Sequence, residues 1–268
     1  MVLKKTEINK MSSGEKLQKQ PGDKTPFREP LVNFGGKSDI KQFENNPNKL
    51  VRIKYGFNTL EDVEKEVVWF RESGRVFKEF SEKCDIPVVR VDMVIGEDKG
   101  RPALFEVVDR IDGANLGDTP IDQENVEEMT AMIDTLYTKL VNYHAEKYAK
   151  GGRYLDDLWE EQFVYGKKPG DRSKRIYLVD VDPFISEYNA ENRNDPKNST
   201  LMAQILFLAG DIVSLEERLS GRKLEGARNE FRHFFNALAP SDIHNGYIKK
   251  AKDVLLAGSD SIYFNKSE

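Results

Sequence analysis

The chain has 268 residues, of which 38% are hydrophobic and 32% are charged, so it can bury the core of one large domain or of two lobes that share a cleft. With 41 Lys and Arg residues against 46 Asp and Glu residues, it carries a formal net charge of −5. This charge argues against a non-specific binder of DNA or RNA, which would present a basic face, although a local basic groove for phosphate groups is compatible with it.

The first 29 residues are rich in Lys, Glu, Ser, Gln and Pro and contain almost no large apolar side chains. Such a segment cannot bury enough surface to offset the entropy that it would lose on ordering. We therefore expect a disordered tail over residues 1–29, with ordered structure beginning near residue 30.

A strand and a long helix are predicted next. Residues 50–55 alternate apolar and polar side chains, as a half-buried strand does. Thr59 and Asp62 then resemble a helix-capping pair, and Pro87 marks the end of the helix. Between them, apolar residues recur at helical spacing: Val63, Val67, Phe70, Phe77 and Phe80.

Two further strands, over residues 88–95 and 103–108, are joined by the charged turn 96–100, which predicts an antiparallel hairpin. Residues 126–148 form a strongly amphipathic pattern that predicts a helix. The remaining elements are expected to be a loop segment over residues 151–166, an apolar strand over 176–179, and helices over 201–219, 224–238 and 241–257. Strands with one helix come first and helices later, which indicates an α+β fold without alternating βαβ units or a glycine-rich phosphate loop.

Residues 104–116 combine an apolar strand, an acidic residue, a short extended link, a glycine and a leucine. This order resembles the hinge of the protein-kinase superfamily. The resemblance implies that Val108 is the gatekeeper and that the backbone of Asp109 and of Ile111 meets the adenine edge of ATP.

Residues 155–166 resemble the catalytic loop of the same superfamily, in which an Asp and an Asn lie five positions apart before two apolar residues. Here the pair is Asp157 and Gln162. The next apolar strand ends in Asp180, which looks like the metal-binding Asp of the superfamily, and Asp182 follows two positions later. In an extended backbone both carboxylates would point the same way.

Lys54 closes the stretch Val51-Arg52-Ile53-Lys54, which is similar to the V-A-I-K strand of protein kinases. The resemblance implies an ion pair between this lysine and a glutamate of the following helix. We expect Glu66 to be that partner, with Glu72 and Glu79 as alternatives.

Four matching segments in the right order resemble the protein-kinase-like superfamily, in its atypical bacterial and small-molecule-kinase-like branch, over roughly residues 32–184. The resemblance implies a two-lobed protein-kinase-like α+β fold, with a small antiparallel sheet and one long helix in the N-lobe and a mainly helical C-lobe. The expected division is a tail over residues 1–29, an N-lobe over 30–110 and a C-lobe over 111–268.

The resemblance also implies the chemistry of phosphoryl transfer, which requires positioning and charge compensation. Lys54, held by Glu66, would contact the α- and β-phosphates of ATP. Asp180 and the side-chain oxygen of Gln162 would bind Mg²⁺, with Asp182 supporting a second ion. Asp157 would orient or deprotonate the attacking hydroxyl.

Each of these residues also has a purely structural interpretation. Lys54 could be a solvated strand lysine, and Asp157 lies in a loop with Asp156, Glu160 and Glu161 that could be a solvated acidic cluster. His144 lies on the amphipathic helix and is expected to be a packed core histidine rather than a catalyst.

Some features depart from the pattern of an active kinase. Leu155 stands where the superfamily usually has His or Tyr, and Gln162 stands where it has Asn. The only candidate for a glycine-rich phosphate cover is the short stretch 33–37, and no A-P-E segment follows Asp182.

We therefore keep two functions open. The first is an ATP-dependent phosphotransferase that acts on a hydroxyl of an unidentified small molecule or protein, which the joint presence of Lys54, Asp157 and Asp180 favours. The alternative is a catalytically inactive pseudokinase that serves as a nucleotide-binding or protein-interaction scaffold. Nucleotidyl transfer from ATP is a third outcome.

A cytoplasmic protein without nucleic-acid or membrane partners is expected. The single cysteine, Cys84, excludes an intramolecular disulfide and a multi-cysteine zinc site, and it suits a reducing compartment. No apolar run reaches the roughly 20 residues that span a bilayer, and the N-terminal lysines are not followed by the apolar core of a secretory signal.

Overall fold

The computed structural model describes residues 26–34, 37–179, 185–193, 195, 198–239, 242 and 245–257. These residues fall into two compact units, each assembled from several stretches of the chain. The first unit comprises the residues up to Gly74, with Val89–Gly113 and Gly166–Arg175. The second comprises Arg75–Val88, Ala114–Tyr165 and the residues from Ile176 onward. A single division near residue 110 therefore stays a prediction, because each unit draws on separate stretches.

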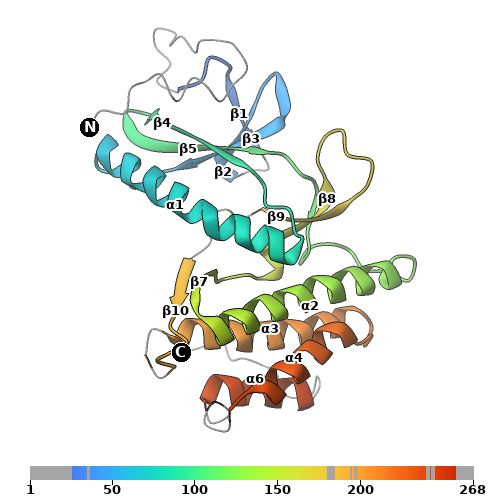
Figure 1. Cartoon of the computed structure of the whole chain (residues 1–268). Helices are drawn as coiled ribbons and strands as arrows, with labels where there is room; N and C mark the ends of the chain where they lie inside the picture. The colour runs from blue at the N-terminus through green and yellow to red at the C-terminus, as the bar shows by residue number, and fades with distance from the viewer. Residues whose placement is uncertain are drawn as a thin grey trace. The chain divides into compact units, whose positions relative to one another are not determined.

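The first unit is built on a five-stranded antiparallel sheet (Figure 1). Its strands, in spatial order, are β1 (Leu31–Phe34), β2 (Lys37–Phe43), β3 (Asn46–Lys54), β5 (Arg101–Asp109) and β4 (Val91–Asp98). The predicted hairpin of β4 and β5 is confirmed. Its turn is shorter than the predicted stretch 96–100, since β4 continues to Asp98. Lys99 and Gly100, with φ of 49° and 76°, adopt the left-handed conformation that a tight two-residue turn requires.

One face of this sheet carries a cluster of buried side chains from β3 and β5: Val51, Ile53, Ala103 and Phe105. The ring of Phe27 packs edge-on against Phe105, with 5.5 Å between the ring centroids, and against Phe43 at 5.0 Å. Phe27 belongs to the stretch expected to be a tail, so ordered packing begins before residue 30. Residues 1–25 lie outside the described residues.

The other face of the sheet is covered by helix α1 (Leu60–Cys84), whose buried Val63 and Val67 pack against Leu104 of β5. The predicted capping pair is confirmed. The amide of Thr59 donates to the Asp62 carboxylate at 3.1 Å, and the amide of Asp62 donates to the Thr59 hydroxyl at 3.2 Å. This pairing satisfies two backbone donors that the first turn of a helix otherwise leaves free.

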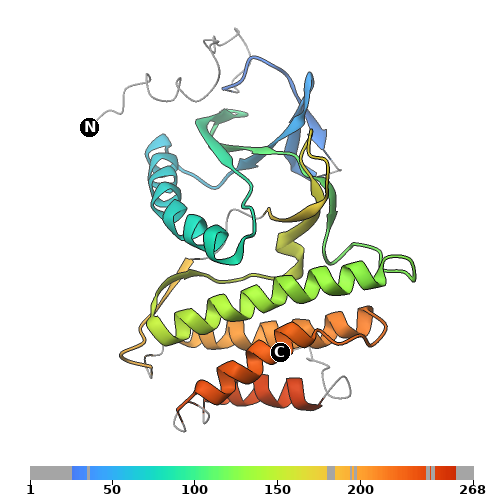
Figure 2. The same ribbon diagram turned by 45° about the vertical axis from the view of Figure 1, so that its right-hand side comes forward.

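The second unit is mainly helical and contains α2 (Val126–Lys150), α3 (Ser199–Arg218), α4 (Glu225–Ala237) and α6 (Gly246–Ala257). Figures 1 and 2 show α2 stacked on α3, with α4 and α6 beyond them. The last helix begins at Gly246 rather than at residue 241. α3 is long and apolar enough to cross a membrane by length and composition, but 61% of that stretch is buried inside the protein, as in a core helix. The expected α+β class, with sheet and one helix first and helices later, is confirmed.

Short strands occupy the stretch 151–166, which the sequence pattern had assigned to a loop. β7 (Gly152–Leu155) pairs antiparallel with β10 (Ile185–Tyr188). β8 (Phe163–Lys167) is the central strand of a three-stranded sheet with β6 (Asp112–Asn115) and β9 (Arg175–Leu178). The loop assignment was wrong because strands of four or five residues are too short to show alternation, and their partners are distant in sequence.

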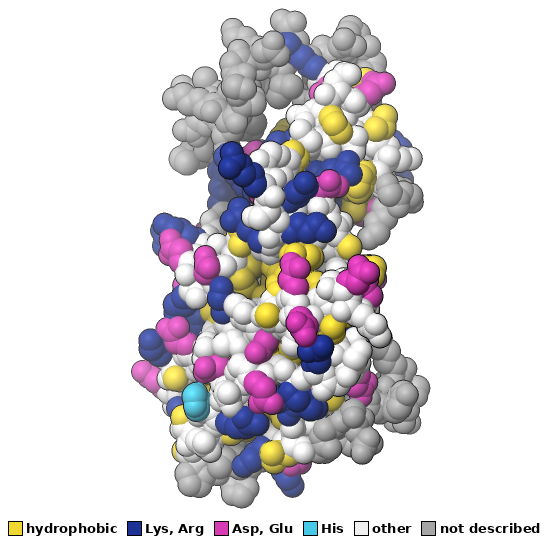
Figure 3. Space-filling model, turned by 90° about the vertical axis from the view of Figure 1, so that its right-hand side faces the viewer, with side chains coloured by type: hydrophobic (Ala, Val, Ile, Leu, Met, Phe, Trp, Pro, Cys, Tyr) yellow, Lys and Arg dark blue, Asp and Glu magenta, His cyan; other side chains and the backbone are white. Residues whose placement is uncertain are grey.

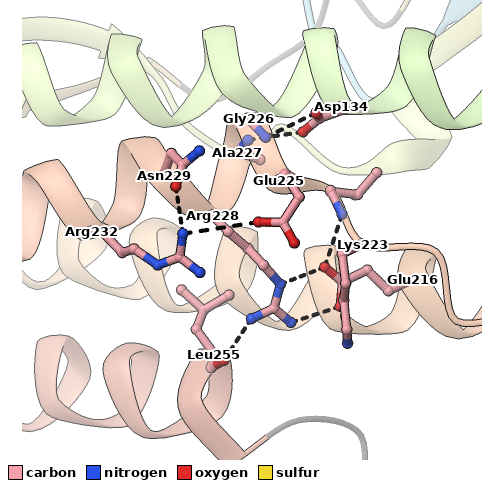
Figure 4. A network of polar contacts seen from close by, with 11 residues as sticks. Asp134, Glu216, Lys223, Glu225, Gly226, Ala227, Arg228, Asn229, Arg232 and Leu255 are labelled. Atoms are coloured by element: carbon pink, nitrogen blue, oxygen red, sulfur yellow. Dashed lines mark hydrogen bonds and ion pairs between the residues drawn. The ribbon is translucent and has the colours of Figure 1, made fainter.

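Helix α4 begins in close contact with α2 at Gly226 (Figure 4). The amides of Gly226 and Ala227 each donate to a carboxylate oxygen of Asp134 at 2.9 Å, which caps the helix. A Cβ atom at position 226 would lie 2.7 Å from the Thr138 hydroxyl oxygen and 2.9 Å from an Asp134 oxygen. The contact therefore leaves no room for a side chain.

We expect Gly226→Ala to lower the free energy of unfolding by about 1–3 kcal/mol, because the new methyl group must displace α4 from its cap. Gly210→Ala, in the middle of α3, is the matched control. A Cβ atom there meets no described atom within 4 Å. Alanine should therefore stabilise that helix by about 0.5–1 kcal/mol. Urea unfolding measures both changes, and a similar effect of the two substitutions would contradict the tight contact at α4.

Candidate functional site

Lys54, the last residue of β3, forms an ion pair with Glu66 of α1, with 2.7 Å between Nζ and Oε1. Both side chains are about three-quarters buried, with 28% and 27% of their surface exposed. The alternative Glu79 instead accepts Lys147 at 2.6 Å and Lys83 at 3.0 Å. The pairing expected from the sequence is therefore present, and a partly buried cation is held at the end of β3.

A second ion pair lies on the same face of the sheet as Lys54. The register places Arg52 opposite Glu106, and the Arg52 Nε donates to the Glu106 carboxylate at 2.5 Å. Glu106 is buried, with 1% of its surface exposed. Sequence reasoning missed this pair, although two signals were present: an arginine where the V-A-I-K strand has alanine, and a glutamate inside an apolar strand.

The predicted hinge residues follow this pair at the end of β5. Val108 is half-buried and lies opposite Leu50 in the register. The Asp109 carboxylate accepts Lys49 at 2.5 Å and Lys168 at 3.3 Å. Burial acts to raise the pKa of Asp109, but hydrogen bonds from these two lysines outweigh burial and keep the pKa below its usual value. Ile111 lies half-buried in the link between β5 and β6, and the contacts of this link with adenine stay a prediction.

Asp157 adopts a left-handed backbone conformation with φ of 56°, which is uncommon for a residue other than glycine and stores strain. Its amide donates to the side-chain oxygen of Gln204 at 3.0 Å, and its carboxylate accepts the indole N–H of Trp159. Gln204 also donates to the Leu158 carbonyl at 3.4 Å. Gln204 thus holds the backbone of the loop, and Trp159 holds the Asp157 carboxylate.

Gln204 was not identified from the sequence, although it positions the loop from the second turn of α3. Only 3% of its surface is exposed. The available signal was a single amide side chain within the apolar run of residues 201–209. A buried amide must satisfy its hydrogen bonds, and here the backbone around Asp157 satisfies them.

The two residues before Asp157 are buried. Leu155 is fully buried in β7, and its amide donates to the Tyr143 hydroxyl at 3.0 Å, so it acts as a core residue. Asp156, 4% exposed, accepts the Ser186 hydroxyl through Oδ2. Its Oδ1 is buried and has no hydrogen-bond partner among the described residues. Burial raises the pKa of Asp156; the Ser186 hydrogen bond opposes this rise, and the charge of Asp157 adds to it.

Of the predicted metal ligands, only Gln162 lies within the described residues; Asp180 and Asp182 lie outside them. Gln162 is half-buried at the end of a short 3-10 helix (Glu160–Gln162), and its backbone carbonyl accepts the amide of Val179 at 3.0 Å. The residue just before Asp180 in the chain is therefore held beside Gln162. Within the described part of the chain, no group of three or more His, Cys, Asp and Glu side chains could hold a metal ion. The amide oxygen of Gln162 has the hard-donor chemistry that Mg²⁺ prefers, so the residue fits that ion.

A cavity of about 410 Å³ in the second unit is lined by the loop around Asp157 together with β10 and α3. Its polar and aromatic lining residues are Asp156, Asp157, Trp159, Ser186, Thr200, Gln204 and Phe207. The volume lies in the range of small-molecule sites. A carboxylate of fixed orientation therefore borders a space that can hold a small molecule.

His144 is a core residue, as predicted. It is 1% exposed, and its ring nitrogens lie 2.8 Å from the Leu140 carbonyl oxygen and 3.3 Å from that of Leu155. Burial lowers its pKa to about 4, so the ring is neutral at physiological pH. The ring connects α2 to β7 and is excluded from the cavity lining described above.

No protein-family model matches the chain, and no curated protein matches it. Among solved structures, a double mutant of the PknI kinase domain of Mycobacterium tuberculosis is similar, with 18% sequence identity. The match covers 85% of this chain and 95% of that chain, with a TM-score of 0.41. At this TM-score the likeness adds no argument about function.

Proposed function

We propose that this chain is an ATP-dependent phosphotransferase that transfers the γ-phosphate to a hydroxyl group. The observation that carries the proposal is the Lys54–Glu66 ion pair, which holds a partly buried cation at the end of β3. Phosphoryl transfer depends on such a cation because negative charge accumulates on the phosphate oxygens. The resemblance of the surrounding strand to a kinase V-A-I-K strand supports the same role.

The proposed roles follow from the chemistry of each side chain. Lys54 would contact the α- and β-phosphates, and Glu66 would keep its ammonium group in place. Asp157 would accept the proton of the attacking hydroxyl, since its carboxylate is fixed by Trp159. Mg²⁺, when bound, would compensate the charge of the β- and γ-phosphates. Its proposed ligands are Asp180, Gln162 and, for a second ion, Asp182.

Adenine recognition is assigned to the end of β5. Val108 is the proposed gatekeeper, and the backbone of Asp109 and Ile111 is proposed to bind the adenine edge. Lys49 and Lys168 both bind the Asp109 carboxylate. Because its side chain is held in this way, only the backbone of Asp109 would meet the base. Arg52 stands where the V-A-I-K pattern has alanine, and its ion pair with Glu106 makes the face of the sheet that carries Lys54 more polar than alanine would.

An inactive nucleotide-binding scaffold is the second candidate. Leu155 favours it, because a fully buried core residue occupies the position where active kinases usually carry His or Tyr. This candidate predicts Mg²⁺-ATP binding without turnover. Measurement of ADP release beside nucleotide affinity therefore separates the two functions.

Replacement of Glu66 tests the ion pair directly. We expect Glu66→Gln to weaken Mg²⁺-ATP binding about tenfold, because a neutral amide holds the Lys54 ammonium less firmly than a carboxylate does. Glu72→Gln, on the exposed face of the same helix, is the matched control and should leave the affinity unchanged. Isothermal titration calorimetry measures both affinities. Equal affinities of wild type and Glu66→Gln would remove the main support for the proposal.

A further inference from the structure

Helix α1 carries apolar side chains on its outer side that stay exposed. Single exposed apolar side chains are common on protein surfaces, and Figure 3 shows several of them among charged side chains on one face of the molecule. α1 differs because it carries three of the eight exposed large apolar side chains of the described residues, namely Leu60, Val68 and Trp69, with 44%, 46% and 37% of their surface exposed. Val68 and Trp69 are neighbours, and such a group indicates a surface that binds a partner.

The packing of α1 on the sheet uses Val68 and Trp69 only in part. Val63 and Val67, on the inner side of the helix, are buried against Leu104 of β5. Val68 and Trp69 remain partly in water, although full burial of a large apolar side chain is worth about 1.5–3 kcal/mol. A partner that covers both side chains would therefore gain free energy from their burial.

Charged side chains continue the same stripe of α1 on both sides of Val68. Residues 61, 65, 68, 72 and 75 follow one another at intervals of four, three, four and three, which places them on one side of a helix. Glu61, Lys65, Glu72 and Arg75 are all exposed. Because the stripe carries both carboxylates and cations, a partner of uniform charge would meet repulsion as well as attraction. A partner that carries both signs in matching order is required.

A second copy of α1 that runs antiparallel provides the matching order. When a two-fold axis passes between residues 68 and 69, each residue lies at the level of the residue equally far from the axis on the other helix. The pairs that face each other across the axis are Lys65 with Glu72, Arg75 with Asp62, and Val68 with Trp69. Symmetry repeats each contact, so opposite charges surround an apolar centre. We propose that two copies of this chain form a symmetric dimer through the outer side of α1.

The ion pairs that Lys65 forms within the chain do not prevent this pairing. Lys65 contacts Glu61 at 3.2 Å and Asp62 at 3.9 Å, and all three side chains are exposed to solvent. Such pairs contribute little to stability, so they exchange readily for pairs with a second copy. One side of one helix is small for a protein interface, and we expect a weak dimer with a dissociation constant on the order of 10 µM. The dimer is independent of the proposed phosphotransferase function.

Sedimentation velocity of the whole chain at increasing concentrations tests the dimer. We expect Lys65→Glu, and likewise Glu72→Lys, to weaken the dimer at least about tenfold, because two contacts between like charges replace two ion pairs. The double variant Lys65→Glu/Glu72→Lys exchanges the two charges, so it should restore the wild-type dissociation constant within about threefold. Lys78→Glu is the matched control. Lys78 is exposed on α1 but lies at the level of the residue before the helix in the second copy, so this variant should dimerise as wild type does.

The proposal is overturned if the chain stays monomeric up to about 300 µM, well above the expected dissociation constant. That result would leave the outer side of α1 to a different partner. The proposal is also overturned if both single variants dimerise as wild type does, if the double variant stays as weak as the single ones, or if Lys78→Glu weakens the dimer equally. Oligomers that grow beyond two copies would contradict the two-fold symmetry, since a two-fold contact closes on itself.

Discussion

Glu216→Ala is expected to lower the free energy of unfolding by about 3–5 kcal/mol, because it leaves the Arg228 guanidinium, whose side chain is only 11% exposed, without its carboxylate. Glu216, on α3, is 2% exposed and accepts Arg228 of α4 through both oxygens, at 2.5 and 2.6 Å (Figure 4). It also accepts the Lys223 ammonium at 2.8 Å and the amide of Leu224 at 3.0 Å. Arg228 donates in turn to the Leu255 carbonyl of α6 at 2.7 Å. The Glu216–Arg228 pair therefore connects α3, α4 and α6.

The pKa of Glu216 sets the pH range of this stabilisation. Burial acts to raise this pKa, but hydrogen bonds from Arg228 and Lys223 outweigh burial and lower it below the usual 4.5. A carboxyl whose pKa falls on folding stabilises the protein above the unfolded pKa and loses that effect as the pH falls below it. The difference between wild type and Glu216→Ala should therefore be complete at neutral pH and shrink below about pH 4.5.

The matched control is Glu217→Ala, since Glu217 is the exposed neighbour on the same helix. Its effect on the free energy of unfolding should stay within about 0.5 kcal/mol. Chemical denaturation at neutral pH measures both variants. A loss of less than about 1 kcal/mol for Glu216→Ala would show that the network contributes no more than a surface ion pair.

Asp157→Asn is expected to reduce the rate of ADP release about 10²–10⁴-fold, which is the range for loss of a general base. Asparagine keeps the shape of the side chain and an oxygen that can accept the Trp159 indole N–H, so the loop should keep its conformation. Only the ability to accept a proton is lost. The affinity for Mg²⁺-ATP should therefore change little, and the reduction should appear in the turnover rate.

Glu161→Gln is the control for this substitution, because Glu161 is an exposed carboxylate of the same acidic loop. A coupled assay of ADP release compares the two variants with wild type. If Asp157 belongs merely to a solvated acidic cluster, both variants will retain the wild-type rate. If both lose activity equally, the effect comes from the charge of the loop rather than from a base.

Long and periodic elements could be predicted from the sequence because their signals are local. The Thr59–Asp62 capping pair and the apolar stripe after it located α1, and the charged turn located the β4–β5 hairpin. Four-residue strands such as β7 could not be located, since pairing with β10 stabilises them and their own pattern is too short.

In the candidate site, too, contacts with a local sequence signal could be predicted and contacts between distant residues could not. The Lys54–Glu66 pair was predictable because a sequence pattern marks the lysine and the helix that follows offers few candidate glutamates. Gln204 and Asp157 are 47 positions apart, and Arg52 and Glu106 are 54 apart. Such contacts depend on tertiary structure, which no local pattern encodes. The metal ligands Asp180 and Asp182 stay predictions from sequence alone.

Thermal unfolding with and without Mg²⁺-ATP tests whether the chain binds Mg²⁺-ATP through Lys54. A ligand that binds only the folded state adds about 2.7 kcal/mol to the free energy of unfolding at a concentration one hundred times its dissociation constant, and so raises the unfolding midpoint. We expect wild type to shift by several degrees in millimolar Mg²⁺-ATP, and Lys54→Ala and Asp180→Asn to shift little. An unchanged midpoint for wild type, or an equal shift for all three proteins, would contradict Mg²⁺-ATP binding through Lys54.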